Sequence, residues 1–128
     1  MKLDLSKLVE IKPRLNKLID ILTKELLDKE KEINSMNIGL VTFINMEPNK
    51  ETNKDFGYAK IDGKWGLCVR FKGAKPEDER LVAIAHTSMH DRITVRDLIP
   101  QLIDKMARNA EKTVAKLEKD LGLEPGNY

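Results

Sequence analysis

Apolar residues recur at spacings of three and four along the first 33 residues of the chain. Lysines and acids fill the positions between them, and this periodicity predicts a helix with one buried face. Pro13 cannot donate a backbone hydrogen bond, so we expect the stretch from Asp4 to Lys12 to form a separate turn or a segment kinked against the main helix. The apolar stripe comprises Leu8, Ile11, Leu15, Leu18, Leu22 and Leu26, and it is widened by Ile19 and Leu27.

The same periodicity predicts a second long helix over residues 88–121. Ser88 is a suitable N-cap because Asp91 follows three residues later, as in a capping box. Gly122 suits the left-handed position that ends many helices. Pro100 has no N–H to donate a backbone hydrogen bond to the carbonyl of Arg96, so it should bend the helix there. The stripe of this helix comprises Ile93, Leu98, Ile99, Leu102, Ile103, Met106, Ala110, Val114, Leu117 and Leu121.

The residues between the two helices have the composition of short strands and polar loops. Apolar and β-branched residues predict strands at 36–44 and 81–87 and a hairpin at 56–71. Polar loops are predicted at 45–55 and 72–80. Because residues 81–87 are apolar on both faces, we expect them to form a central strand, or one covered on both sides.

These elements predict the α+β fold class, in the order α-β-β-β-β-α. A four-stranded, mainly antiparallel sheet should pack with two long, proline-kinked helices. The length of 128 residues is that of one domain, which we place at residues 1–122, followed by a flexible C-terminal tail at 123–128.

The hairpin has a defined register, because Asp62-Gly63 is a strong signal for a two-residue type I′ turn. This register pairs Ile61 with Lys64 and continues to Phe56 opposite Val69. Cross-strand partners share a face of the sheet. One face therefore carries the bulky side chains of Phe56, Tyr58, Lys60, Trp65, Leu67, Val69 and Phe71, and the other carries Gly57, Ala59, Ile61, Lys64, Gly66, Cys68 and Arg70.

Two interpretations of the bulky face remain open. In the first, the two helices cover it and it forms the core, because burying each aromatic side chain contributes roughly 1.5–3 kcal/mol. In the second, the helices pack on the small face, and the bulky face becomes a recognition surface or a dimer interface. The candidate binding residues are then Phe56, Tyr58, Lys60, Trp65 and Arg70.

Charge is spread evenly along the chain, with 23 basic and 21 acidic residues. This balance counts against a generic nucleic-acid-binding protein. A basic line on the last helix nevertheless has the spacing to follow a phosphate backbone, although acids flank it and could form ordinary i,i+4 pairs with it. The candidate nucleic-acid contacts are Lys105, Arg108, Lys112, Lys116 and Lys119.

Candidate catalytic and metal-binding groups are few. His86 and His90 have metal-ligand spacing only if one helix carries both, whereas the pattern places one at the end of a strand and the other at the start of a helix. Cys68 lies in the middle of a strand, where an inert buried thiol is common. We therefore expect no catalytic residues, no metal and no cofactor. The alternative is a metal site at His86 and His90, in a small metal-dependent enzyme or ligand-binding protein.

The lengths of the two helices suggest a homo-oligomer. Helices of about 20–30 residues, at about 1.5 Å per residue, extend beyond a sheet of four strands. Their apolar ends would be exposed unless a second chain covered them, which favours a dimer with a helical bundle across a two-fold axis. The single cysteine, the lack of a signal peptide and the lack of a membrane-length apolar run predict a cytoplasmic protein without membrane contact.

The hairpin motif K-x-D-G-x-W-G-L is carried by Lys60, Asp62, Gly63, Trp65, Gly66 and Leu67. Together with the spacing of Arg92, Ile93, Pro100 and Leu102, it resembles a pattern in small bacterial proteins carried by phages, plasmids and other mobile elements. The resemblance covers roughly residues 57–106, and it implies an architecture and a genetic setting but no catalytic residue. We therefore expect a non-catalytic binding protein, such as an inhibitor that binds or sequesters a host defence factor. A nucleic-acid-binding protein is the alternative.

Overall fold

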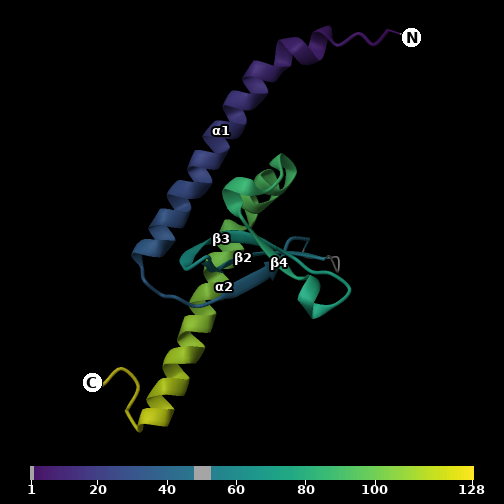
Figure 1. The fold of residues 1–128 in the computed structure, drawn as a ribbon. Helices are drawn as coiled ribbons and strands as arrows, with labels where there is room; N and C mark the ends of the chain where they lie inside the picture. Colours follow the sequence, from purple (N-terminus) through teal and green to yellow (C-terminus); the bar gives the residue numbers. More distant parts are fainter. Residues whose placement is uncertain (1, 48–52) are drawn as a thin grey trace.

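The computed structural model describes residues 2–47 and 53–128 and has the predicted α+β order. One long helix, four antiparallel strands and a second long helix follow one another along the chain, and two single-turn 3₁₀ helices flank the last strand (Figure 1). The elements are α1 (Ser6–Ser35), β1 (Thr42–Asn45), β2 (Lys54–Ile61), β3 (Lys64–Phe71), η1 (Pro76–Asp78), β4 (Arg80–Ala83), η2 (Ile84–His86) and α2 (Met89–Leu121).

Helix α1 runs without interruption through Pro13, so the prediction of a separate turn from Asp4 to Lys12 is wrong, whereas the alternative of a kinked segment agrees with the structure (Figure 1). A proline inside a helix removes one intrahelical hydrogen bond, here to the carbonyl of Val9. This part of α1 projects away from the rest of the molecule, so that carbonyl can bond to water instead. Figure 1 shows the first turns of α1 at an angle to the remainder of the helix.

Both ends of α2 are capped as the sequence predicts. The hydroxyl of Ser88 accepts a hydrogen bond from the backbone N–H of Asp91 at 3.1 Å. Gly122 adopts the left-handed conformation with φ of 66°, and the N–H of Leu123 then donates to the carbonyl of Glu118 at 2.8 Å. Pro100 lies inside α2.

The hairpin register is confirmed residue by residue. β2 and β3 pair from Ile61 opposite Lys64 to Phe56 opposite Val69, and the pairing continues to Lys54 opposite Phe71. Asp62 and Gly63 have φ values of 49° and 80°, the positive values that a type I′ turn requires at both positions.

Two predicted strands are shorter in the structure. The strand predicted at 36–44 begins only at Thr42, because Asn37 and Gly39 adopt positive φ values of 53° and 63° that break the extended backbone. The strand predicted at 81–87 ends at Ala83 and lies at the edge of the sheet, so the prediction of a central strand is wrong. The run is apolar for a different reason, because the chain turns into η2 and places Ile84 in the core.

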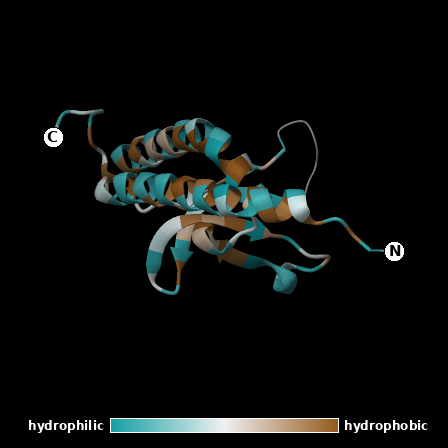
Figure 2. Ribbon diagram, turned by 90° about the horizontal axis from the view of Figure 1, so that it is seen from above, coloured by the Kyte–Doolittle hydropathy of each residue, from teal (hydrophilic) through white to brown (hydrophobic). Residues whose placement is uncertain are grey.

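The molecule has two layers, with both long helices on one face of the sheet (Figure 2). α1 packs against β3 and η2, whereas α2 packs against β1 and β2. The two helices run in the same general direction but are staggered, so that the N-terminal half of α1 and the C-terminal half of α2 project from opposite ends (Figure 1). The buried core comprises Leu26, Ile33, Met46, Phe56, Tyr58, Leu67, Val69, Ile84, Val95, Leu98, Leu102 and Met106.

Candidate functional site

The bulky face of the hairpin forms the core, and this result decides between the two interpretations. Phe56 and Tyr58 expose only 0% and 3% of their surface, and Leu67 and Val69 are fully buried beneath the helices. Phe56 and Tyr58 therefore do not form a surface for a partner, because the apolar stripes of α1 and α2 already cover them. Burial, together with the charge of Glu30, raises the pKa of Tyr58.

Trp65 lies at the rim of this core and is half-buried. Its ring stacks on that of Tyr58, with 5.3 Å between centroids and 18° between planes. The hydroxyl of Tyr58 donates to the side-chain oxygen of Asn34, whose amide nitrogen donates to the carbonyl of Trp65 at 3.3 Å. A hollow of about 510 Å³ adjoins the indole, but the polar groups of Asn34 and Tyr58 that line it are already used to hold the hairpin against α1. Lys60, the remaining candidate on this face, is exposed.

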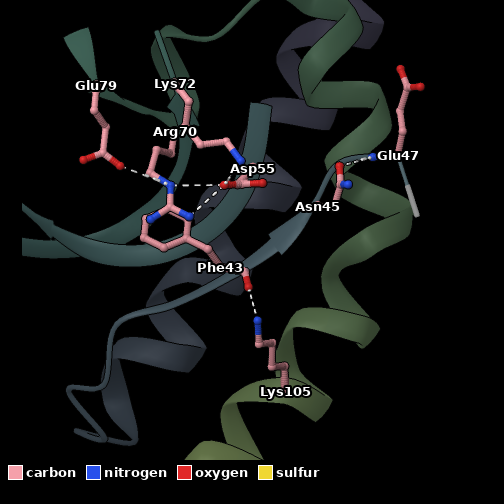
Figure 3. Close-up of polar contacts among 8 residues, drawn as sticks. All are labelled: Phe43, Asn45, Glu47, Asp55, Arg70, Lys72, Glu79 and Lys105. Atoms are coloured by element: carbon pink, nitrogen blue, oxygen red, sulfur yellow. Dashed lines mark hydrogen bonds and ion pairs between the residues drawn. The ribbon is translucent and has the colours of Figure 1, made fainter. Parts of the chain in front are cut away.

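Arg70 lies on the opposite face of the sheet, in a cluster with Asp55, Lys72, Glu79 and Phe43 (Figure 3). Its Nε and Nη2 both donate to Oδ2 of Asp55, at 3.1 and 2.7 Å. Lys72 Nζ lies 3.2 Å from the same oxygen, and Glu79 lies 3.3 Å from Arg70 Nε. The guanidinium also covers the ring of Phe43 at 3.9 Å. These contacts give Arg70 a structural role, since they bind its charge to a buried carboxylate.

The basic line on α2 is partly neutralised by contacts within the chain. Lys105 Nζ donates to the carbonyl of Phe43 at 2.6 Å, which fixes α2 to β1. Arg108 pairs with Asp104 at 3.3 Å and Lys116 pairs with Asp120, each one helical turn away, as the sequence predicts. Lys112 and Lys119 are exposed on the same helix.

The structure places His86 in η2 and His90 in the first turn of α2, so they lie on different elements. Within the described ranges 2–47 and 53–128, no group of three or more His, Cys, Asp or Glu residues could hold a metal ion. Cys68 is fully buried, and this burial raises its pKa to about 12, so the thiol stays protonated at neutral pH and is a poor nucleophile. No helix among the described residues is long and apolar enough to span a bilayer.

A groove of about 860 Å³ lies between α1 and α2. Ile33 of α1 and Met36, the C-cap of that helix, line one side of it, and Ile99, Pro100 and Ile103 line the other side from α2. Charged side chains form its rim, and at one end Arg96 Nε donates to Glu25 at 2.8 Å. This hydrogen bond lowers the pKa of Glu25. The groove thus combines an apolar floor with a charged rim, which is the chemistry of a site for an amphipathic helix.

Two exposed apolar stripes continue this groove in opposite directions. The N-terminal stripe is the part of the α1 stripe that projects beyond the sheet, and its exposed fractions include 63% at Leu8 and 62% at Leu18. The C-terminal stripe lies on the projecting part of α2, and Leu121 there is 67% exposed. The N-terminal stripe comprises Leu8, Ile11, Leu15 and Leu18, and the C-terminal stripe comprises Val114, Leu117 and Leu121.

We call the groove and the two stripes together the helical face. The sequence placed the residues of both exposed stripes, and the groove residues Ile99 and Ile103, in its predicted apolar stripes. It left Ile33 out of these stripes and assigned Met36 to a predicted strand. It gave no indication of the groove, because a groove depends on the distance between two helices that are about 60 residues apart in the chain. It also missed Glu30 and Asn34, whose contacts with β3 have no local sequence signal.

Comparisons with protein-family models, with curated proteins and with solved structures found no match for this chain. The helical face therefore has to be interpreted from its own geometry and chemistry.

Proposed function

We propose that this chain is a non-catalytic protein that acts by binding other protein chains through the helical face. The observation that supports this proposal most is the apolar groove between α1 and α2, continued at both ends by exposed apolar stripes. Contiguous apolar surface on this scale is uncommon on monomers and marks interaction sites. Grooves between helices bind amphipathic helices through apolar residues at helical spacing.

The proposal includes homo-oligomerisation and leaves room for a different protein partner. In the phage or plasmid setting suggested by the hairpin motif of Lys60, Asp62 and Trp65, such a protein would work in the cytoplasm. It would block a host factor by occupying it or sequestering it. The contacts of Lys105, Arg108 and Lys116 within the chain make nucleic acid a less favourable partner.

A pull-down experiment tests the proposal. Three tagged forms of the chain are each incubated with a bacterial lysate to which untagged chain has been added, and the proteins that each form retains are compared. The forms are wild type, Ile103→Lys in the groove, and Val41→Lys as a matched control at an exposed apolar residue outside the helical face. We expect wild type and Val41→Lys to retain the same chains and Ile103→Lys to lose them. If all three forms retain the same proteins, the helical face is not the binding surface and the proposal is wrong.

A further inference from the structure

The contacts between α1 and α2 fix the stagger of the two helices. Arg92 Nη1 donates to Thr23 Oγ1 at 2.7 Å, and Arg96 pairs with Glu25 at 2.8 Å. At the other end of the groove, Met36 lies directly after the last residue of α1 and Ile103 lies on α2. The groove therefore extends from residue 25 of α1 to its C-cap at residue 36, and over residues 96–103 of α2, and its midpoint lies at the level of Glu30 and Ile99.

The two exposed stripes are placed symmetrically about this midpoint. Leu8 lies 22 residues before Glu30, and Leu121 lies 22 residues after Ile99, which is about 33 Å along the helix in each case. Likewise, Leu15 precedes Glu30 by 15 residues and Val114 follows Ile99 by 15. A foreign helix would need only one of these stripes, whereas equal distances on both sides are what a two-fold axis requires.

From this symmetry we infer that the helical face binds a second copy of the same chain, antiparallel, about a two-fold axis that crosses the groove at the level of Glu30 and Ile99. This inference rests on the proposed function and names its partner. The rotation places the N-terminal stripe of each copy against the C-terminal stripe of the other, so that Leu8 faces Leu121 and Leu15 faces Val114. The grooves face one another at the centre, and the helices form an antiparallel bundle.

Area and charge both agree with this arrangement. A strip about 66 Å long and about 12 Å wide, one helix diameter, covers roughly 800 Å². Stable interfaces bury about 800 Å² on each partner. Lys29 and Glu32 lie on the groove rim on either side of residue 30. An antiparallel copy of α1 therefore brings the Lys29 side chain of each copy near the Glu32 carboxylate of the other.

The orientation can be tested by oxidative cross-linking of two single variants, Leu15→Cys and Val114→Cys. We expect a disulfide-linked dimer when the two variants are refolded together, and none when either is oxidised alone. Cys68 is buried, and the wild-type chain controls for its reactivity. Cross-linking of Leu15→Cys with itself, or a dimer that gives no mixed cross-link, would overturn the antiparallel arrangement.

Light scattering on a size-exclusion column tests whether the dimer exists at all. We expect a mass twice the 14.6 kDa of the chain for wild type and for Val41→Lys. Leu15→Lys should raise the dissociation constant at least 100-fold, with an unchanged circular dichroism spectrum because Leu15 lies at the surface. A wild-type monomer at micromolar concentration would refute the inference. The proposed function would still stand if wild type retained a protein other than a second copy of the chain in the lysate experiment and Ile103→Lys did not retain it.

Discussion

The carboxylate of Glu30 accepts a hydrogen bond from the backbone N–H of Leu67 at 2.8 Å. β4 pairs with β3 only as far as Cys68, so this N–H belongs to a part of the β3 edge that β4 does not cover. One helical turn further along α1, the side-chain amide of Asn34 donates to the carbonyl of Trp65 at 3.3 Å. Two side chains of α1 thus occupy the place of a neighbouring strand, and they attach the helix to the edge of the sheet.

We expect Glu30→Ala to lower the free energy of unfolding by about 1–3 kcal/mol, because it leaves the N–H of Leu67 without its charged acceptor. Glu30→Gln keeps an acceptor oxygen and should cost less. Urea unfolding followed by circular dichroism measures both. Glu10→Ala, an exposed glutamate of the same helix outside the helical face, is the control and should stay within about 0.5 kcal/mol of wild type. An equal loss for Glu30→Ala and Glu10→Ala would mean that the edge contact contributes nothing.

Gly57→Ala should be severely destabilising. A Cβ at this position would lie 2.2 Å from Cδ1 of Phe43 and 2.4 Å from the carbonyl oxygen of Thr42. The backbone oxygen cannot move without distorting the pairing of β1 with β2, so we expect a loss of about 3 kcal/mol. At Gly66 the nearest atom would be the flexible carboxylate of Glu30, at 2.9 Å. Gly66→Ala should therefore lower the thermal midpoint by less, and the reverse order would contradict this explanation.

Arg70→Lys should destabilise the fold even though it keeps the positive charge. Lysine cannot make both hydrogen bonds to Asp55, and it lacks the planar group that covers Phe43. We expect a loss of about 1–2 kcal/mol in chemical denaturation. Arg108→Lys is the matched control, because its pair with Asp104 is exposed and contributes at most about 0.5 kcal/mol. If the two substitutions have the same effect, the cluster around Asp55 does not stabilise the sheet.

Cys68 should make stability fall at alkaline pH. Its pKa is raised from 9.0 to about 12 by burial, so below pH 9 the thiol is protonated in both states and its contribution to stability is fully present. Between pH 9 and 12 the unfolded chain releases this proton while the folded chain keeps it. The free energy of unfolding therefore falls by up to about 1.4 kcal/mol per pH unit. Cys68→Ala lacks this slope, so wild type should lose roughly 2–3 kcal/mol relative to the variant between pH 9 and 11. If the free energy of unfolding of the two proteins depends on pH in the same way, the alkaline loss of stability does not come from Cys68.

Local sequence signals predicted the order of the elements and the register of the hairpin accurately. The turn at Asp62-Gly63 set the register of β2 and β3, and Ser88 and Gly122 set the ends of α2, because each of these features depends on the backbone preferences of a few adjacent residues. The same local reasoning failed for residues 81–87. An apolar run is compatible with a central strand, but here it divides into an edge strand and a turn that delivers Ile84 to the core.

The sequence by itself determined the α+β order, the two faces of the hairpin and the excess length of the helices, because periodicity and turn chemistry are properties of neighbouring residues. Only the tertiary structure decided that the helices cover the bulky face, that Glu30 and Asn34 complete the edge of β3, and that α1 and α2 are staggered. These relationships depend on packing between residues far apart in the chain, where shape and burial, rather than local preference, select one arrangement. The symmetric placement of the exposed stripes about the groove is a consequence of that stagger.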